Sequence, residues 1–319
     1  MANNHNSTGG DSSTFLESVN FTDKNVADIE LCTRQQRDSD MWMEQRKGRL
    51  TASKHHAVKS KMNIIGKSAG AHPVKVTPLV AEIFGHGRDI SFVPSVRHGQ
   101  NSESKAMEEL VTLLLPAHSN LTFRKSGLYV KKDLPYIAAS PDGILTCNCC
   151  GQTVIEIKCP YKIFGKVSVQ DGYQQLDYLQ SDGTSITLKE SHPHYFQVQS
   201  QMAVTGIHRS MFVVWSGVGC PLLVPIKFCE SHWRSLLPSL VNFFKAYILP
   251  HLFGEEEFTF CPVCSDICLP CGEITISSDN SICCNTCQLW FHWKCVNLTH
   301  SQVPEEWFCD SCSGEQLNN

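Results

Sequence analysis

The segment SPDGILTCNCCGQTVIEIKCP, residues 140–160, carries the pattern on which the fold depends. In its second half Ile155 and Ile157 alternate with Glu156 and Lys158. Successive side chains of a β-strand point to opposite faces, so the isoleucines can pack on a core while the acid and the lysine share the other face. The pattern predicts a strand with one apolar face and one face suited to chemistry.

A hairpin would bring a second acid to that polar face. Asp142 lies before a turn glycine, and a hairpin from 142 to 156 places it beside Glu156, while Pro160 ends the second strand. Two carboxylates and the Lys158 ammonium then converge, and oxygen ligands of this kind suit Mg²⁺ or Mn²⁺. Such a metal can polarise a phosphodiester and activate water. Taken alone, Glu-x-Lys is more often an ordinary surface pair, so motifs elsewhere in the chain are needed to distinguish a surface pair from a catalytic site.

The whole chain is typical of a globular protein with one large domain, or one medium and one small. Its 319 residues are 42% hydrophobic and 18% charged. The start lacks the apolar core of a signal peptide, and no run is long enough to span a membrane. We therefore expect a reducing compartment, in which the 17 cysteines are free or bound to metal rather than paired in disulfides.

Charge is distributed unevenly along the chain. The formal net charge is −4, yet residues 40–75 hold eight Lys and Arg against Asp40 and Glu44, a local charge of +6. Residues 255–319 hold ten Asp and Glu against Lys294, a local charge of −9. A basic segment and an acidic tail predict two different partners.

Periodicity predicts an α/β domain that ends near residue 253, after a disordered segment at 1–25. Ser102 is expected to cap a helix to Leu115, with Glu103 pointing inward on the same stripe as Ala106, Leu110, Leu113 and Leu114. Further helices are expected at 194–204 and at 231–248, where Pro238 should kink the helix or start its second half. Strands are expected at 127–130, 136–139, 144–147, 154–159, 211–215 and 222–228.

Five motifs in fixed order resemble the phage lambda exonuclease or YqaJ-like viral recombinase family of PD-(D/E)xK nucleases, over about residues 40–250. They are WMEQRKGRLTAS (42–53), HGQNSESKA (98–106), SPDG (140–143), EIKCP (156–160) and YFQVQSQMAVTG (195–206). The resemblance implies a restriction-endonuclease-like mixed sheet flanked by helices. It also implies metal-dependent digestion of linear duplex DNA from 5′ ends, and some relatives assemble as ring-shaped trimers.

The resemblance also implies roles for individual residues. Metal-binding positions are matched by Glu103, Asp142, Glu156 and the Ile157 carbonyl, and catalytic positions by Lys158 and Gln197. Arg46 and Ser53 match the residues that hold the 5′-terminal phosphate, and the local charge of +6 around them fits that role. Lambda exonuclease has a further arginine where this chain has Lys162 and Lys166, so 5′-phosphate preference is less firmly implied.

Two other functions are open at this stage. The nuclease fold could be inactive and bind DNA or histones, although the intact set of acids and lysine argues against that. The metal site could instead serve an endonuclease or nickase of the same superfamily, since it does not itself select ends. Gln201 lies one helical turn after Gln197, and these two glutamines could equally be surface groups.

The cysteines of the hairpin are not required by the catalytic pattern. Cys147, Cys149, Cys150 and Cys159 could form a small zinc clip, but no Cys-x-x-Cys spacing supports it, so free cysteines are the plainer interpretation.

The last 60 residues form a second cluster of metal-ligand pairs. Ten of the 17 cysteines follow residue 260, and eight ligands in four pairs would make two tetrahedral zinc sites. So short a segment needs metal for its stability, and a reducing compartment disfavours the disulfide alternative. The four pairs are Cys268/Cys271, Cys284/Cys287, His292/Cys295 and Cys309/Cys312.

The spacing and the segments WFHWKC and WFCDSC resemble the PHD finger, over about residues 258–315. Its cross-brace implies one zinc on Cys268, Cys271, His292 and Cys295, and a second on Cys284, Cys287, Cys309 and Cys312. Cys261/Cys264 is the alternative to the first pair. Such fingers commonly read histone tails, and Trp290 either binds the peptide or packs in the core. A nuclear location and a basic-peptide partner are therefore expected.

Overall fold

The computed structural model describes residues 21–67, 76–86, 93–253, 280–285, 290–299, 303–304 and 306–309. The chain divides into two compact units, each described by itself. One comprises Asn20–His55 and Asp89–Leu237 and contains the predicted strand at 154–159. The described residues of the other unit lie within 56–86, 238–253 and 280–309.

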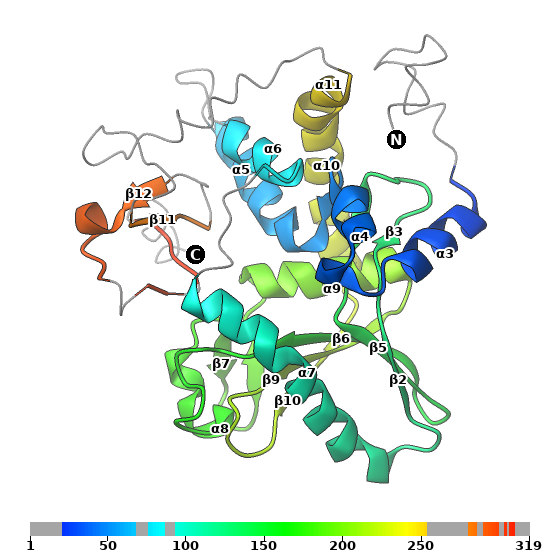
Figure 1. Cartoon of the computed structure of the whole chain (residues 1–319), viewed down its shortest axis with the longest axis vertical. Coiled ribbons are helices and arrows are strands. Elements are labelled where there is room, and N and C mark those ends of the chain that lie inside the picture. The colour runs from blue at the N-terminus through cyan, green and yellow to red at the C-terminus, as the bar shows by residue number, and fades with distance from the viewer. Residues whose placement is uncertain are drawn as a thin grey trace. The chain divides into compact units, whose positions relative to one another are not determined.

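A mixed five-stranded sheet forms the centre of the first unit (Figure 1). The order is β10-β9-β6-β5-β2, and only β6 and β9 run parallel. The strands are β2 (Thr122–Lys125), β5 (Gly143–Cys147), β6 (Gly151–Lys158), β9 (Arg209–Val214) and β10 (Leu222–Lys227). The predicted mixed sheet flanked by helices is therefore confirmed.

Two helices cover opposite faces of this sheet. On one face α7 (Pro94–Leu114) packs Ala106 and Leu110 against Ile155 and Ile157 of β6. On the other face α9 (Pro193–Thr205) packs Val198 and other apolar residues against the neighbouring strands. The alternation seen in the sequence therefore separates two faces that are both buried. Glu156 lies on the face covered by α9 and is only 2% exposed, although it is charged.

A second sheet carries the turn that precedes the hairpin. It has the order β1-β4-β3, with β1 (Leu50–Thr51) parallel to β4 (Ile137–Ala139) and β3 (Tyr129–Val130) antiparallel to β4. The helices α3 (Asp23–Cys32) and α4 (Asp40–Arg46) precede it, and the turn η2 (Ala52–Lys54) follows β1. β7 (Leu179–Ser181) and β8 (Ile186–Leu188) form a separate pair, after α8 (Val169–Gly172).

Several boundaries differ from the sequence prediction. The helix expected from Ser102 begins at Pro94, so Ser102 lies inside α7, and Leu113 is exposed rather than part of the buried stripe. The segment expected to be disordered reaches residue 25, but α3 begins at Asp23, while residues 1–20 lie outside the described part. β1, β2, β7 and β8 were not expected, because short edge strands carry little periodicity.

One of the remaining helices contains Pro238, at which the sequence predicted a kink or a helix start. The chain continues through Pro238 as one helix, α10 (Glu230–Phe243), and widens to a π-helical turn at Phe244–Ile248 before α11 (Leu249–Leu252). Pro238 therefore neither ends nor begins a helix. The other helices of this unit are α5 (His55–Lys67) and α6 (Thr77–Ile83). No helix in the described segments has the length and apolar content needed to cross a membrane.

Candidate active site

The hairpin of β5 and β6 places Asp142 beside the end of β6, as predicted. Gly143 pairs with Ile155, the main-chain N–H of Asp142 donates to the Ile155 carbonyl at 3.0 Å, and the Ile157 N–H donates to Asp142 Oδ2 at 2.6 Å. Gly143 is the first residue of β5 rather than a turn residue. A Cβ there would lie 2.0 Å from the Phe123 ring of β2, so close packing explains the glycine.

Glu156 is the centre of the polar cluster. Its Oε1 accepts hydrogen bonds from Lys158 Nζ at 2.8 Å and from Gln197 Nε2 at 2.6 Å. Its Oε2 accepts from Gln201 Nε2, also at 2.6 Å. Gln197 and Gln201 lie one turn apart on α9, and Gln201 is fully buried. The two glutamines therefore hold the carboxylate against α9 rather than facing solvent.

Burial and the charges of the cluster raise the pKa values of both Asp142 and Lys158. Burial, and then the negative charges of Glu156 and Glu103, raise the pKa of Asp142 well above its usual value. Burial alone would lower the pKa of Lys158, but the charges of Glu156 and Asp142 outweigh it and raise that pKa. Lys158 therefore stays protonated at neutral pH and pairs with Glu156, and Arg37 pairs with Glu103, so the two cations do not balance all three carboxylates.

Glu103 reaches the same group from α7. Its carboxylate is 2.8 Å from the Arg37 guanidinium, and its charge acts on both Asp142 and Lys158. The predicted inward carboxylate therefore has a partner, which comes from η1 (Gln36–Asp38). Four predicted residues, Glu103, Asp142, Glu156 and Lys158, are thus brought together from three parts of the chain.

Arg46 and Ser53 flank one hydroxyl. Arg46 Nη2 and Ser53 Oγ each lie 3.5 Å from Thr51 Oγ1. The Arg46 guanidinium stacks 4.0 Å from the centre of the Trp42 ring, and the indole N–H donates to Ser140 Oγ at 2.9 Å. Burial lowers the pKa of Arg46 to about 10, and no carboxylate of the described residues pairs with it. A desolvated cation thus lies on the chain of contacts that leads to the SPDG turn.

The two lysines near the expected arginine position point elsewhere. Lys162 Nζ donates to the Gln175 carbonyl at 3.1 Å, and Lys166 Nζ donates to the Lys162 carbonyl at 3.0 Å. Both ammonium groups are exposed and are held by main-chain carbonyls.

Sequence reasoning missed three contributors. Gln201 was placed one helical turn after Gln197 and could have been a surface group, and only the packing of α9 shows that its amide contacts Glu156. Arg37 lies outside every motif, and nothing in the sequence signals its pairing with Glu103. His194, one turn before Gln197, is held neutral because burial and then the Lys158 charge lower its pKa; its spacing from Gln197 was the available signal.

The described part of the C-terminal segment contains half of the predicted zinc ligands. The strands β11 (Ser281–Cys283) and β12 (Trp290–His292) pair, and Cys284 and Cys309 are buried in one cluster. The Cys309 N–H donates to Cys284 Sγ at 3.3 Å, a contact typical of thiolate ligands. His292 is buried and Cys295 partly buried, within or beside η6 (Trp293–Val296). The predictions for the Trp290 side chain and for Cys261, Cys264, Cys268, Cys271, Cys287 and Cys312 fall outside the described residues.

A model of the YqaJ-like viral recombinase domain matches residues 41–208, more than half of the chain. The chain belongs to the YqaJ-like viral recombinase family. In this family member a PHD-finger model also matches residues 261–312, so the predicted resemblance to a PHD finger is confirmed. A PHD finger implies bound zinc.

Curated relatives of this YqaJ-like chain match its finger. The PHD finger protein ALFIN-LIKE 4 of Arabidopsis thaliana is 37% identical over 54 residues, which are 16% of this chain and 21% of the relative. The transcription initiation factor TFIID subunit 3 of Gallus gallus is 31% identical over 87 residues, 26% of this chain and 8% of the relative. The match with the first of these thus spans about a fifth of that protein.

Solved structures similar to the chain include an alkaline exonuclease from Laribacter hongkongensis, with a TM-score of 0.46 and 18% identity, covering 67% of this chain and 94% of that one. The shutoff and exonuclease protein of Kaposi's sarcoma-associated herpesvirus has a TM-score of 0.44 and 15% identity, covering 72% and 73% of the two chains.

Proposed function

We propose that the chain is a metal-dependent deoxyribonuclease that degrades linear duplex DNA from its 5′ ends. The observation that carries the proposal is the cluster of Asp142, Glu156, Glu103 and Lys158 at one end of the β5–β6 hairpin. Membership of a viral recombinase family supports it, since recombination requires processing of DNA ends. We take residues 26–253 as the nuclease domain and 258–315 as the finger.

The donor set of the cluster fits a hard divalent cation. Burial, and then the charges of Glu156 and Glu103, raise the pKa of Asp142, and Mg²⁺ or Mn²⁺ would relieve the repulsion among the three carboxylates. Gln201 Oε1 is a buried acceptor with no hydrogen-bond donor among the described residues, so it fits a water carried by a hydrated cation. We assign the cation to Glu103, Asp142, Glu156 and the Ile157 carbonyl. When bound, it supplies Lewis-acid polarisation of the phosphate and a water of lowered pKa.

The chain's own residues position and stabilise charge. Because its pKa is raised, Lys158 acts as a cation and hydrogen-bond donor, which can orient the attacking water and stabilise the charge that develops on the phosphate. Gln197 and Gln201 fix both oxygens of Glu156, so the carboxylate keeps one orientation through the reaction. Glu103 is oriented in turn by Arg37.

End selection is assigned to Arg46 and Ser53. Arg46 is desolvated, stacked on Trp42 and not paired with a carboxylate of the described residues, so its planar guanidinium is available to a terminal phosphate. Trp42 is bonded to Ser140, two residues before Asp142, which links phosphate binding to the catalytic cluster.

The decisive experiment compares DNA topologies. Purified full-length protein is incubated with Mg²⁺ and end-labelled linear duplex, beside closed circular duplex. We expect loss of the strand from its 5′ ends, no cutting of the circle, and no activity in excess EDTA until Mg²⁺ is restored. Nicking of the circle would identify an endonuclease, and binding without cutting would identify an inactive nuclease fold.

A substitution tests the assignment of the terminal phosphate. Arg46→Ala should lower the rate on 5′-phosphate ends by about tenfold or more and leave the slower rate on 5′-hydroxyl ends nearly unchanged. Arg234→Ala is the matched control, since Arg234 is exposed and pairs with Glu230. Equal loss on both kinds of end would reduce Arg46 to a general DNA contact.

The finger is proposed to bind two Zn²⁺ and a basic peptide such as a histone tail. Its ligands would be the two sets of four given by the cross-brace, and its acidic charge would attract a basic partner and repel DNA. This role favours a nuclear location. Calorimetric titration of the full chain with an unmodified or lysine-methylated histone N-terminal peptide should show weak binding that Trp290→Ala removes without loss of zinc. No heat with either peptide would leave the finger as a protein-docking or structural module.

A further inference from the structure

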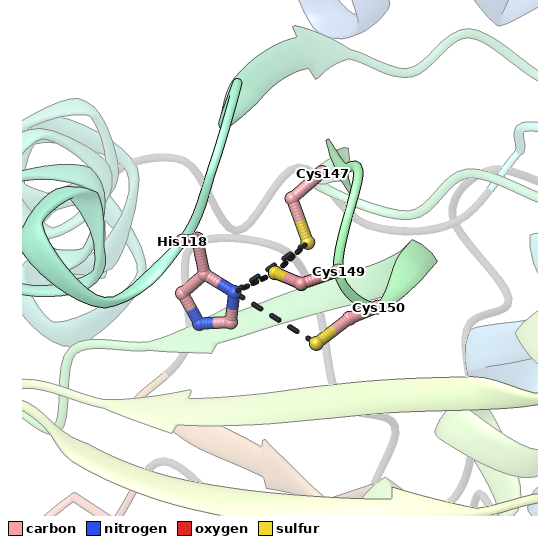
Figure 2. Close-up of side chains that lie close together, drawn as sticks. All are labelled: His118, Cys147, Cys149 and Cys150. Carbon is pink, nitrogen blue, oxygen red and sulfur yellow. Dashed lines mark hydrogen bonds between the residues drawn. The ribbon is translucent and has the colours of Figure 1, made fainter.

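Four side chains with metal-binding atoms meet at the other end of the β5–β6 hairpin. They are His118, Cys147, Cys149 and Cys150, and their ligand atoms all lie within 4.8 Å of one another (Figure 2). His118 Nδ1 lies 3.3 Å from Cys149 Sγ, 3.4 Å from Cys147 Sγ and 3.8 Å from Cys150 Sγ. The sulfurs of Cys147 and Cys149 are 3.4 Å apart.

The backbone holds these residues in place from three segments. β5 ends at Cys147, which pairs with Gly151, and the left-handed φ of +75° at Gly151 allows the tight turn through Cys149 and Cys150. The Asn148 N–H donates to the Ser119 carbonyl at 3.0 Å, which fixes the segment of His118 beside the turn. Arg209 Nη1 on β9 donates to the Cys150 carbonyl at 2.8 Å. The cluster is therefore a built feature of the fold.

The spacings agree with those of one tetrahedral metal ion. With Zn–S bonds of about 2.3 Å and Zn–N bonds of about 2.05 Å, neighbouring ligand atoms of a tetrahedron are about 3.5 to 3.8 Å apart. The four separations in the structure lie at or within a few tenths of an ångström of that range. We propose that His118 Nδ1 and the thiolates of Cys147, Cys149 and Cys150 bind one structural Zn²⁺, separate from the finger and from the catalytic cluster.

The composition of the site favours zinc over other occupants. Three thiolates and one imidazole are soft to borderline ligands, which select Zn²⁺ over the Mg²⁺ or Mn²⁺ that suits the carboxylates. Four protein ligands close a tetrahedral site and leave no position for water, which makes the site structural. The three thiols are not joined in disulfides.

This assignment corrects the ligand set considered from the sequence. Cys159 is not part of the group: it lies beyond the opposite end of β6 and packs with Ala106 and Leu110 in the cluster under α7. His118 replaces it, from the segment between η3 (Leu115–Ala117) and β2. Because β2 pairs with β5, a residue about 30 positions earlier reaches the turn. A zinc ion here would tie the end of α7 to the hairpin.

The test is the metal content of the full-length protein, measured after extensive dialysis. Removal of two ligands in Cys149→Ser/Cys150→Ser should lower the zinc content by about one ion per chain relative to the parent. The parent and the double variant both keep the zinc of the finger, so the difference reports the hairpin site alone. Cys220→Ser is the matched control: Cys220 is also an exposed cysteine, outside the group, and the variant should keep the parent value. Equal zinc in all three proteins would overturn the proposal.

A ligand exchange separates zinc loss from misfolding. His118→Ala should lose about one zinc per chain, while His118→Cys should keep it, because a thiolate can replace the imidazole. In the Co²⁺-substituted parent, visible bands of tetrahedral thiolate coordination should be stronger than in the double variant by the contribution of one site. The assignment would be contradicted if His118→Ala kept the zinc content of the parent, or if the Co²⁺ spectra of the parent and the double variant were identical.

Discussion

The two ends of the β5–β6 hairpin carry opposite kinds of ligand. One end gathers carboxylates and an ammonium, from Asp142, Glu156 and Lys158, and the other gathers sulfur and imidazole, from the turn cysteines and His118. About 16 Å of strand separates Gly151 from Glu156. The same pair of strands thus carries hard ligands at one end, where we propose hydrolysis, and soft ligands at the other, where we propose a structural zinc ion.

The surroundings of the two ends differ as much as the ligands. Glu156 is 2% exposed beneath α9, where low polarity strengthens every charge interaction. At the turn Cys149 is exposed. The turn is held by hydrogen bonds from the Asn148 N–H and from Arg209, to which the proposed zinc ion would add, whereas the carboxylate end is held by the packing of α9 and α7.

The largest effect is expected at the catalytic end. Lys158→Ala should lower the rate of DNA hydrolysis by at least about 100-fold, because the cation that stabilises the developing charge is removed. Zinc content and far-ultraviolet circular dichroism should stay at the parent values, since Lys158 faces the site rather than the core. Rate and zinc are measured on the same preparation.

The control for this substitution is Lys125→Ala, at the exposed end of β2. It should cleave DNA at the parent rate. If Lys158→Ala also cleaved at that rate, the catalytic assignment would be wrong, and if it lost zinc, the two ends of the hairpin would not be independent.

A smaller effect is expected on the stability of the protein at acid pH, through the buried histidine His55 that bonds to α9. His55 is fully buried, donates from Nε2 to the Leu50 carbonyl at 3.0 Å and accepts at Nδ1 from the Ser200 hydroxyl of α9 at 2.8 Å. Burial lowers the pKa of His55 to about 4, so the unfolded state takes up a proton first as pH falls. Stability should therefore fall between pH 6.5 and 4, by on the order of 2 kcal/mol from pH 7 to pH 5.

Urea unfolding at both pH values measures this loss. In His55→Gln the side chain cannot titrate, so the decrease from pH 7 to pH 5 should be smaller by about that amount, whatever the stability at pH 7. An identical decrease in parent and variant would show that other groups cause the acid sensitivity.

The next effect concerns the orientation of Glu156. Gln201→Leu removes the donor to Oε2, and we expect kcat to fall by about tenfold with little change in KM for DNA, because Gln201 is buried and positions the carboxylate. Gln199→Leu is the matched control. Gln199 is equally buried on α9 but bonds the Lys227 carbonyl and the Cys229 N–H, so its loss should affect stability and spare kcat. Equal kcat in the two variants would refute the positioning role.

The smallest effect is expected at the turn. Arg209→Ala removes one hydrogen bond to the Cys150 carbonyl, which is worth about 0.5–1.5 kcal/mol. Transfer of zinc to a coloured chelator should become a few times faster, with no change in DNA hydrolysis. Arg234→Ala should change neither quantity. A slower rate of hydrolysis in Arg209→Ala would show that the turn communicates with the catalytic end.

The sequence alone determined the β5–β6 hairpin, its alternation and the ordered motifs. Alternating Ile155 and Ile157 against Glu156 and Lys158 admits one arrangement of faces, because a shift by one residue would place the charges in the apolar cluster under α7. The ligand spacing of the finger is equally local, since Cys-x-x-Cys brings two sulfurs to one ion without long-range contacts.

Only the tertiary structure decided which distant residues complete each site. Gln201 reaches Glu156 because α9 packs over β6 at the position of Glu156. Arg37 reaches Glu103 because η1 lies beside α7. His118 joins the turn cysteines because β2 pairs with β5 in one register. Periodicity reports which face of an element is buried, but the partner across that face depends on the register and packing of elements far apart in the chain.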